Sequence, residues 1–492
     1  MIGADAGRAT PAKHRPADGL PIALHLEGSR TSDARTGRRC LDGLPSPTPP
    51  GRWGARRGLA CRLADSAALG SPKLLHLGGT VLKALVFGGN GKMGAAVAFD
   101  LLKDDAVEKV GLVARRPDAL EQVKGWLGSD RVEVHPHDIM DKAATQRLMK
   151  RYDVGVNTLP DRRTSYKTVH AAVECGFHIV DMLEEYHYRP DLYETEGLEL
   201  PPGTTLENYG DWLHETALRN DVCFMDGIGF APGLSNITSG EGIRQLDEAE
   251  SVIARVGGIP RKDVAARKPL RYMITWAFDH VLREYMVKLF VRQNGQTVEV
   301  DAGTGRESFH FDKLGKDEML ECSITPGMPS FIYTRPNLKE FAEKTVRWPG
   351  HWAGVDTLKE CGLLGIEPVD HKGTPVVPRE FLLTLIEPKL QTQPGETDVC
   401  VMYCTVTGRK NGKKTRISHW MWEEADPKSG ISAMGRVTGF PAAMGAVLIG
   451  KGLIKERGIV APEDCIYGPL YTQFVADLRK RDIEILETVE TL

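Results

Sequence analysis

The sequence lacks several features that would place a protein quickly in a functional class. Its nine cysteines are scattered and odd in number, and none forms a Cys-x-x-Cys pair, which argues against a disulfide framework or a zinc ribbon. No run approaches the roughly 18 apolar residues of a membrane span. The formal net charge of −3 gives no electrostatic case for nucleic acid or an anionic membrane. We therefore expect a cytoplasmic protein with no metal site and no nucleic-acid or membrane partner.

Residues 1–80 have few of the apolar and aromatic side chains that a folded core needs. Trp53 is the only aromatic residue there, whereas Arg, Gly and Pro are abundant. Such a segment cannot offset its ordering entropy, so we expect it to be disordered. It also lacks the apolar core of a secretory signal. An alternative is a wrongly assigned start, because Val81 directly precedes the first expected strand and a GTG start codon would encode Met there.

A glycine-rich passage follows that strand, which we expect at residues 82–87. Gly89, Gly91 and Gly94 form a Gly-x-Gly-x-x-Gly pattern that opens an apolar helix. In this context Gly89 allows a tight turn, Gly91 lets a pyrophosphate approach the backbone, and Gly94 lets helix and strand pack closely. The helix N-terminus then faces the phosphates. The expected dinucleotide loop comprises Gly89, Asn90, Gly91, Lys92, Met93 and Gly94.

The second expected strand ends without the acidic residue that would bind the ribose 2′-hydroxyl of NAD. Arg115 and Arg116 stand there instead, and arginine suits a 2′-phosphate, so we predict NADP, with NAD as second choice. Asp138 follows the third strand, where the adenine end should lie. Residues 157–160 follow the fourth strand, near the expected nicotinamide end. From these we select Asn157, Leu159 and Pro160 as further cofactor contacts.

Apolar strands alternate with helical patterns across residues 81–233. This alternation predicts a doubly wound parallel sheet, that is, a Rossmann domain. The expected strands are 82–87, 109–114, 132–135, 154–158, 178–181 and 222–226, and the expected helices are 93–102, 118–127, 142–151, 168–175 and 206–219.

The pattern changes after residue 233. Asn294-Gly295 and Asn411-Gly412 each stand between alternating strands, which is a strong hairpin signal. Residues 234–430 therefore predict an α+β domain with an antiparallel sheet. The remaining segment, 431–492, opens with the most apolar helical stretch of the chain at 432–454, in which Pro441 should mark a kink or a helix start.

Five segments, in order, resemble the saccharopine dehydrogenase family, which includes saccharopine reductase, lysine 6-dehydrogenase and the carboxynorspermidine enzymes. They are VFGGNGKMG at 86–94, MDGIGFAPGLSNI at 225–237, VGGIP at 256–260, EKTVRWPGH at 343–351, and the apolar passage at 432–463. The chain departs from saccharopine reductases at Ala231 and at Ser235-Asn236, where those enzymes have Asp and Asp-His. The RWPGH passage is closer to lysine 6-dehydrogenases, which are usually NAD enzymes.

The resemblance implies an oxidoreductase that passes hydride between a nicotinamide and a carbon bearing nitrogen, in an amino acid or related amine. It implies a Rossmann domain, an inserted α+β catalytic and dimerisation domain, and a C-terminal helix that returns to the first domain. It also implies a homodimer. The alternatives are saccharopine reductase proper and, in another class, a non-catalytic NADP(H) sensor.

Three residues are candidates for the chemistry. The resemblance places Arg347 near the family's site, where an arginine could hold a substrate carboxylate, although it could equally fix a turn. His351 is the candidate for proton transfer, since histidine titrates near neutrality, although a lone histidine is more often structural. Tyr186 follows the carboxyl end of the fifth strand, where ligands of α/β sheets collect, beside a Glu-Glu pair that could be simply solvated.

Overall fold

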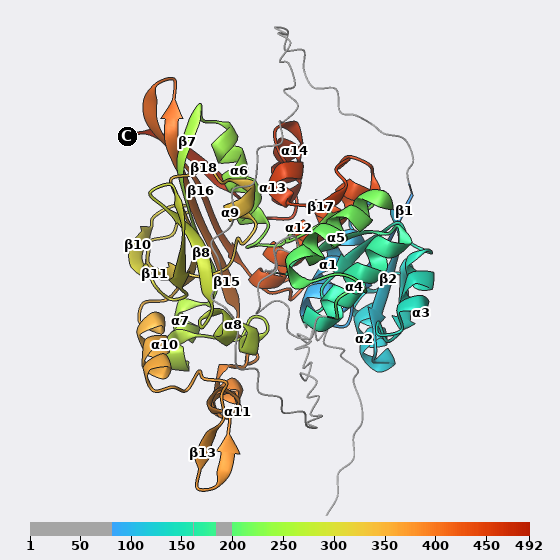
Figure 1. Ribbon diagram of the computed structural model, residues 1–492, viewed down its shortest axis with the longest axis horizontal. Coiled ribbons are helices and arrows are strands. Elements are labelled where there is room, and N and C mark those ends of the chain that lie inside the picture. Colours follow the sequence, from blue (N-terminus) through green and yellow to red (C-terminus); the bar gives the residue numbers. More distant parts are fainter. Residues whose placement is uncertain (1–80, 161, 184–198) are drawn as a thin grey trace, which may run out of the picture. The chain divides into compact units, whose positions relative to one another are not determined.

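The computed structural model of the chain describes residues 81–160, 162–183 and 199–492 (Figure 1). The expectations for residues 1–80 and for Tyr186 fall outside these residues. The described part contains two large sheets and a small hairpin.

The first sheet is the expected parallel sheet, with seven strands in the order β17-β6-β5-β4-β1-β2-β3. All of its strand pairs are parallel. The six expected strands are present, and the C-terminal segment adds a seventh, β17, beside β6. The strands are β1 Leu82–Phe87, β2 Val107–Ala114, β3 Val132–Pro136, β4 Val154–Asn157, β5 His178–Asp181, β6 Cys223–Met225 and β17 Gly458–Val460.

Helices cover both faces of this sheet, which confirms the doubly wound architecture (Figure 1). Buried side chains of α1 and α2 belong to one core cluster, and those of α3, α4 and α5 belong to another. The fourth helix begins earlier than expected, at Arg162. The helices are α1 Lys92–Leu101, α2 Pro117–Leu127, α3 Lys142–Met149, α4 Arg162–Cys175 and α5 Leu206–Arg219.

The second sheet has nine strands and is mixed, whereas an antiparallel sheet was expected. Both Asn-Gly hairpins are confirmed, β8–β9 and β15–β16. The difference lies at β12, which pairs parallel with β7. The strands are β7 Glu248–Pro260, β8 Lys288–Gln293, β9 Gln296–Asp301, β10 Glu307–Phe311, β11 Glu318–Ile324, β12 Glu340–Arg347, β15 Asp398–Lys410, β16 Lys413–Glu424 and β18 Leu486–Thr491.

Short helices and one small hairpin connect these strands. The hairpin, β13 Val369–His371 with β14 Thr374–Val376, lies beyond α11 in Figure 1. The remaining helices are α6 Leu234–Arg244, α7 Lys262–Ala265, the 3₁₀ turn η1 Pro269–Arg271, α8 Phe278–Glu284, α9 Phe331–Thr334, α10 His351–Glu360, α11 Pro378–Leu390, α13 Pro462–Cys465 and α14 Pro469–Arg479.

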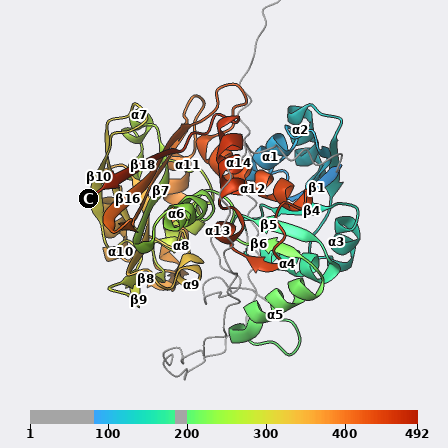
Figure 2. The ribbon, with the colours of Figure 1, turned by 90° about the horizontal axis from the view of Figure 1, so that it is seen from above.

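The apolar passage forms helix α12, Ala433–Gly450, which continues through Pro441. It packs beside α1 and against β4, β5 and β15 (Figure 2). The packing is close, because a Cβ added at Gly439 would lie 3.0 Å from the Cβ of Ala96. By length and composition alone α12 could span a membrane, but 83% of that stretch is buried inside the protein, as in a core helix.

The C-terminal segment contributes to both sheets. Strand β17 pairs with β6 of the first sheet, and β18 pairs with β16 of the second. Together with α12, these strands return the chain to the Rossmann sheet, as expected, and also complete the second sheet.

Candidate functional site

The glycine loop joins β1 to α1 in a closely packed turn. The left-handed residue is Gly88, with φ of 80°, so the role of tight turn expected for Gly89 belongs to Gly88. Gly89 is required for space, since a Cβ there would lie 2.8 Å from the Cβ of Leu112. At Gly94 a Cβ would lie 2.3 Å from the Gly88 carbonyl oxygen. Helix, loop and strand therefore touch through glycine backbone, as the motif predicted.

The N-terminus of α1 is suited to a phosphate. Gly91 is the N-cap residue, no side chain caps the helix, and no acidic residue lies in its first turn. A Cβ at Gly91 would meet only the Gly88 carbonyl, at 3.3 Å, so its outer side is open. Lys92 is exposed, while Asn90 and Met93 are half-buried. Free N–H groups and the positive end of the helix dipole make this loop fit a dinucleotide pyrophosphate.

The two arginines lie, exposed, just beyond the carboxyl end of β2. Arg116 Nη2 donates to Asp118 Oδ2 at 3.1 Å, and the residue forms the N-cap of α2. Arg115 makes no hydrogen bond or ion pair to the described part of the chain. Its guanidinium is therefore available for a 2′-phosphate, and Asp118 restrains its neighbour.

The other predicted cofactor residues also lie at this edge of the sheet, since parallel strands end there together. Asp138 is exposed after β3 and accepts the backbone N–H of Met140 at 3.1 Å. Asn157 is buried at the end of β4, and its Nδ2 donates to Ser165 Oγ at 2.7 Å. Its Oδ1 has no hydrogen-bond partner in the described residues. Leu159 is half-buried and Pro160 exposed.

Arg347 ends strand β12 of the second sheet and is only 5% exposed. Its Nε donates to Tyr285 Oη at 3.1 Å, and its Nη1 donates to the carbonyls of Val346 at 2.9 Å and Gly258 at 3.4 Å. Its guanidinium carbon lies 5.3 Å from the ring centre of Tyr272. Nη2 has no partner in the described residues. Most of the guanidinium is thus fixed by the protein while one nitrogen is left for a ligand.

His351 begins helix α10 and is 1% exposed. Its Nδ1 lies 2.8 Å from the carbonyl oxygen of Leu270, and its Nε2 lies 3.1 Å from Tyr285 Oη. Burial, aided by the Arg347 charge, lowers the pKa of His351 to about 3. The ring is therefore neutral at physiological pH, Nδ1 carries the hydrogen, and Nε2 accepts the Tyr285 hydroxyl proton.

The resulting chain of hydrogen bonds orients Arg347 through Tyr285 and His351. It ends at Leu270, whose φ of 53° places the backbone in the left-handed region. Such strained backbone persists where the surrounding structure fixes it, which is common at functional sites. Both nitrogens of His351 are engaged, so this geometry favours a positioning role, and the expected proton transfer stays a prediction.

Arg436 is a buried arginine on the apolar helix α12. It pairs with Glu423 at 3.3 Å and donates to the carbonyls of Glu424, Arg481 and Asp482. It therefore secures the C-terminal segment.

Three residues of the Arg347 cluster had no signal in the sequence. Tyr272, Thr275 and Tyr285 precede Arg347 by 60 residues or more, in a stretch without a motif. These residues are recognised only by their position beside the buried Arg347, and that position is known only from the folded structure.

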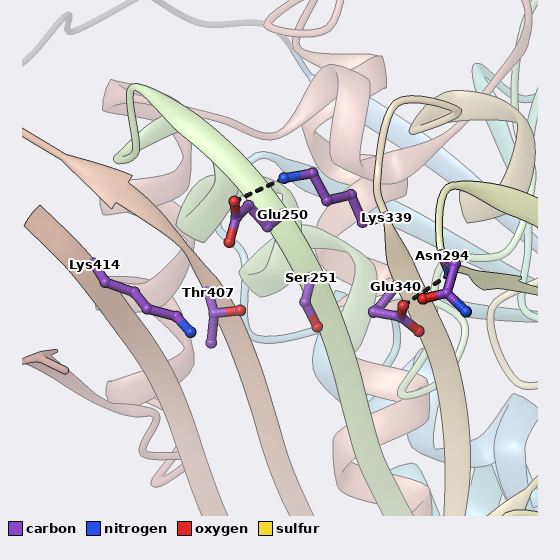
Figure 3. A pocket seen from close by; sticks show the side chains of 7 residues that line it. All are labelled: Glu250, Ser251, Asn294, Lys339, Glu340, Thr407 and Lys414. Atoms are coloured by element: carbon purple, nitrogen blue, oxygen red, sulfur yellow. Dashed lines mark hydrogen bonds and ion pairs between the residues drawn. The ribbon is translucent and has the colours of Figure 1, made fainter. Parts of the chain in front are cut away.

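A shallow depression lies on the second sheet, at the beginning of β7 and β12, whereas Arg347 lies at the end of β12 (Figure 3). Lys339 Nζ donates there to Glu250 Oε1 at 2.8 Å. Along β12, Glu340 and Arg347 are roughly 23 Å apart at the usual rise per residue. The depression is therefore remote from the Arg347 cluster. It is lined by Glu250, Ser251, Asn294, Lys339, Glu340, Thr407 and Lys414.

No group of His, Cys, Asp and Glu side chains in the described residues is arranged to hold a metal ion. Cys400 and Cys404 are fully buried in the core, as expected for structural thiols.

Two family models match the chain. The saccharopine dehydrogenase NADP binding domain matches residues 84–206, and the saccharopine dehydrogenase C-terminal domain matches residues 229–483. The first match contains the glycine loop and both arginines, and the second contains the Arg347 cluster.

Curated proteins and solved structures agree with these models. Carboxyaminopropylagmatine dehydrogenase of Synechocystis is 20% identical, over 78% of this chain and 92% of that protein. The L-glutamate-forming, NADP(+) saccharopine dehydrogenase of Schizosaccharomyces pombe is 20% identical, over 71% of this chain and 88% of that protein. The apo saccharopine dehydrogenase (L-Glu forming) of Saccharomyces cerevisiae shares the fold, with a TM-score of 0.65 at 17% identity, covering 83% of this chain and all of that one.

Proposed function

The chain belongs to the saccharopine dehydrogenase family, and we propose that it transfers hydride between NADP(H) and a carbon that bears nitrogen in an amino acid or related amine. It is an oxidoreductase with the family's NADP-binding domain. Its glycine loop and the arginines after β2 fit that cofactor by shape and charge.

The observation that carries the substrate side of the proposal is Arg347 Nη2, which bonds to none of the residues that the structure describes. A buried arginine held by three hydrogen bonds has lost most of its freedom before any ligand arrives, so a carboxylate can bind it at a low entropic cost. A substrate with a carboxylate and an amine would be oriented by that contact.

The cofactor supplies the hydride acceptor or donor, so the protein's contribution is binding and orientation. The α1 N-terminus holds the pyrophosphate, Arg115 engages the 2′-phosphate, and Arg347 binds the substrate carboxylate. Tyr285 and the neutral His351 keep the guanidinium in place. Tyr186 remains a proposed substrate contact.

A second candidate is the glutamate-forming saccharopine dehydrogenase reaction. The names of the relatives from Schizosaccharomyces and Saccharomyces favour it. The RWPGH passage favours a lysine 6-dehydrogenase-like reaction on a primary amine. The two reactions differ in product, since only the saccharopine dehydrogenase reaction releases glutamate.

Reduction of NADP+ at alkaline pH against L-lysine, L-saccharopine and a panel of ω-amino acids tests the proposal. We expect NADPH formation with at least one of them and a rise in KM of tenfold or more in Arg347→Met. Glutamate release with saccharopine would select the second candidate. Tight NADPH binding without turnover on any of these amines would contradict an enzymatic role and favour a sensor.

Two further expectations from the resemblance belong to the proposal. We propose a homodimer, which sedimentation velocity would test, and a cytoplasmic location, which cell fractionation would test. A monomer at micromolar concentration would contradict the first, and recovery with a membrane or organelle fraction would contradict the second.

A further inference from the structure

Two buried hydroxyl groups between η1 and α8 have no hydrogen-bond partner of full geometry among the residues that the structure describes. Tyr272 is fully buried and Thr275 is 6% exposed, and both Tyr272 Oη and Thr275 Oγ1 are unsatisfied within the described residues. Thr275 forms a weak side-chain hydrogen bond with Tyr272 that lowers the Tyr272 pKa, but neither hydroxyl has a partner of full hydrogen-bond geometry in the described residues. Buried polar groups in native proteins are nearly always satisfied, so this pair requires an explanation.

Both hydroxyl-bearing residues adjoin Arg347. The Tyr272 ring lies under the guanidinium, 5.3 Å from its carbon. Gly258 lies between Thr275 and Arg347. Its carbonyl accepts a hydrogen bond from Arg347 Nη1 at 3.4 Å. A Cβ at Gly258 would lie 3.5 Å from Thr275 Oγ1. Tyr272 therefore contacts Arg347 through its ring, and Thr275 lies one residue, Gly258, away from it.

Two charged side chains act on the Tyr272 ring, Arg347 and the buried Glu284. Burial raises the pKa of Tyr272, so its hydroxyl stays protonated and able to donate, although the Arg347 charge opposes part of that rise. The nearby N-terminus of α12 cannot bind the anion, because Asp398 already accepts the backbone N–H groups of Ala433 and Met434 at 2.7 and 2.9 Å. The donors that remain are one guanidinium nitrogen and two hydroxyls.

We propose that Tyr272 and Thr275 donate hydrogen bonds to the same substrate carboxylate that Arg347 binds, and that they determine the preference of this site for a carboxylate. The inference rests on the proposed function and adds two specificity residues to it. A carboxylate accepts several hydrogen bonds through its two oxygens, so one such group satisfies all three donors.

Isosteric variants that remove only the hydroxyl test this role. Binding of hexanoate and of the neutral hexanamide to the NADP+-loaded protein is measured by calorimetry for wild type, Tyr272→Phe and Thr275→Val. We expect each variant to bind hexanoate about tenfold more weakly, with hexanamide and NADP+ binding unchanged. Thr275→Ser, which keeps the hydroxyl, should restore hexanoate binding. Ser239→Ala removes another buried, unsatisfied hydroxyl, on α6, and should change nothing.

Equal hexanoate affinity in wild type and both variants would overturn the proposal, and is the result expected if a water molecule satisfies the hydroxyls. Absence of hexanoate binding to wild type would also overturn it. Amine oxidation with the same KM in wild type and variants would reject this inference and leave the proposed function standing. The two variants could lose hexanoate binding while the wild-type protein oxidises no amine. That result would retain the anion site and reject the proposed function.

Discussion

At the residue scale, the buried His351 makes the protein sensitive to acid. Its pKa is lowered from its ordinary value to about 3, so its contribution to stability is present above about pH 6.5 and is lost as pH falls toward 3. We expect His351→Gln to remove up to about 5 kcal/mol of that acid-dependent loss. Chemical denaturation of both proteins between these pH values measures it.

The matched control is His371→Gln, at an exposed histidine on β13. It removes a histidine without changing any contact of His351, so a change seen only in His351→Gln belongs to that site. Parallel stability curves for wild type and His351→Gln would show that His351 is not held neutral in the folded protein.

Cofactor preference also depends on single side chains. Arg115 is exposed just after β2 and pairs with none of the described residues, so its loss should remove one charged hydrogen bond to the 2′-phosphate. We expect Arg115→Ala to raise the KM for NADPH by about ten- to a hundredfold and to leave that for NADH unchanged. Arg151→Ala, at an exposed arginine that pairs with Glu133, is the control. A preference for NADH in wild type would contradict the role of Arg115.

Sequence and structure differ most in how individual side chains are engaged. The spacing from the glycine loop indicated Arg115, and the resemblance of the RWPGH passage indicated Arg347; their roles as ligand contacts stay predictions. The partners of Arg347 could not be predicted, since Tyr272 and Tyr285 meet it only after η1, α8 and β12 have folded together. That Gly88, and not Gly89, makes the tight turn could not be predicted either, because the motif specifies which residues are glycine and not their backbone angles.

At the scale of elements, the contact of α1 with β1 depends on Gly94. Its substitution by alanine would place Cβ 2.3 Å from the Gly88 carbonyl oxygen, which forces backbone to move. We expect Gly94→Ala to lower the free energy of unfolding by about 1–3 kcal/mol and to weaken NADP+ binding. Thermal unfolding and NADP+ titration measure the two effects.

The control lies on the next helix. Gly125 in α2 has no atom within 4 Å of an added Cβ. Gly125→Ala should therefore stabilise the protein by about 0.5–1 kcal/mol, because alanine is the better helix former. Similar behaviour of the two variants would contradict the packing argument.

Local sequence signals predicted most helices and strands, and both hairpins, but they did not predict how distant strands pair. Asn294-Gly295 and Asn411-Gly412 fixed both hairpins, because their backbone requirements are local. The parallel pairing of β12 with β7 joins strands far apart in the chain, and nothing local indicates its direction. Pro441 was expected to mark a kink or a helix start; it does not start the helix, because α12 runs through it from Ala433 to Gly450.

At the scale of the whole described structure, one buried carboxyl makes the stability of the protein depend on pH. Glu423 on β16 contacts Arg436 of α12 and accepts the backbone N–H of Glu484. Burial raises its pKa to about 7, against the lowering effects of those contacts. A raised carboxyl pKa stabilises the fold below about pH 4.5, and that contribution is lost as pH rises through 7.

We therefore expect the stability of Glu423→Gln relative to wild type to rise by about 3 kcal/mol between pH 4.5 and 8. Denaturation at several pH values measures it. Arg436 keeps its three carbonyl acceptors in this variant, so it is not left unsatisfied. Glu250→Gln is the control, because the hydrogen bond from Lys339 lowers the pKa of that carboxyl and the variant should therefore show no rise. A constant difference across this pH range would show that Glu423 is ionised throughout.

The Rossmann sheet was predictable from its alternating strands and helices, but its seventh strand was not. Strand β17 has only three residues, too short for a periodic signal, and it follows the long helix α12. Its place beside β6 is therefore visible only in the folded chain.

That late strand has a consequence for synthesis. As the chain leaves the ribosome, β6 emerges long before β17, and at usual translation rates its outer edge waits roughly 10 to 50 seconds for a partner. The outer edge of β16 likewise waits for β18. Until β17 and β18 emerge, the growing chain therefore carries two open strand edges, which chaperones would have to shield from other chains.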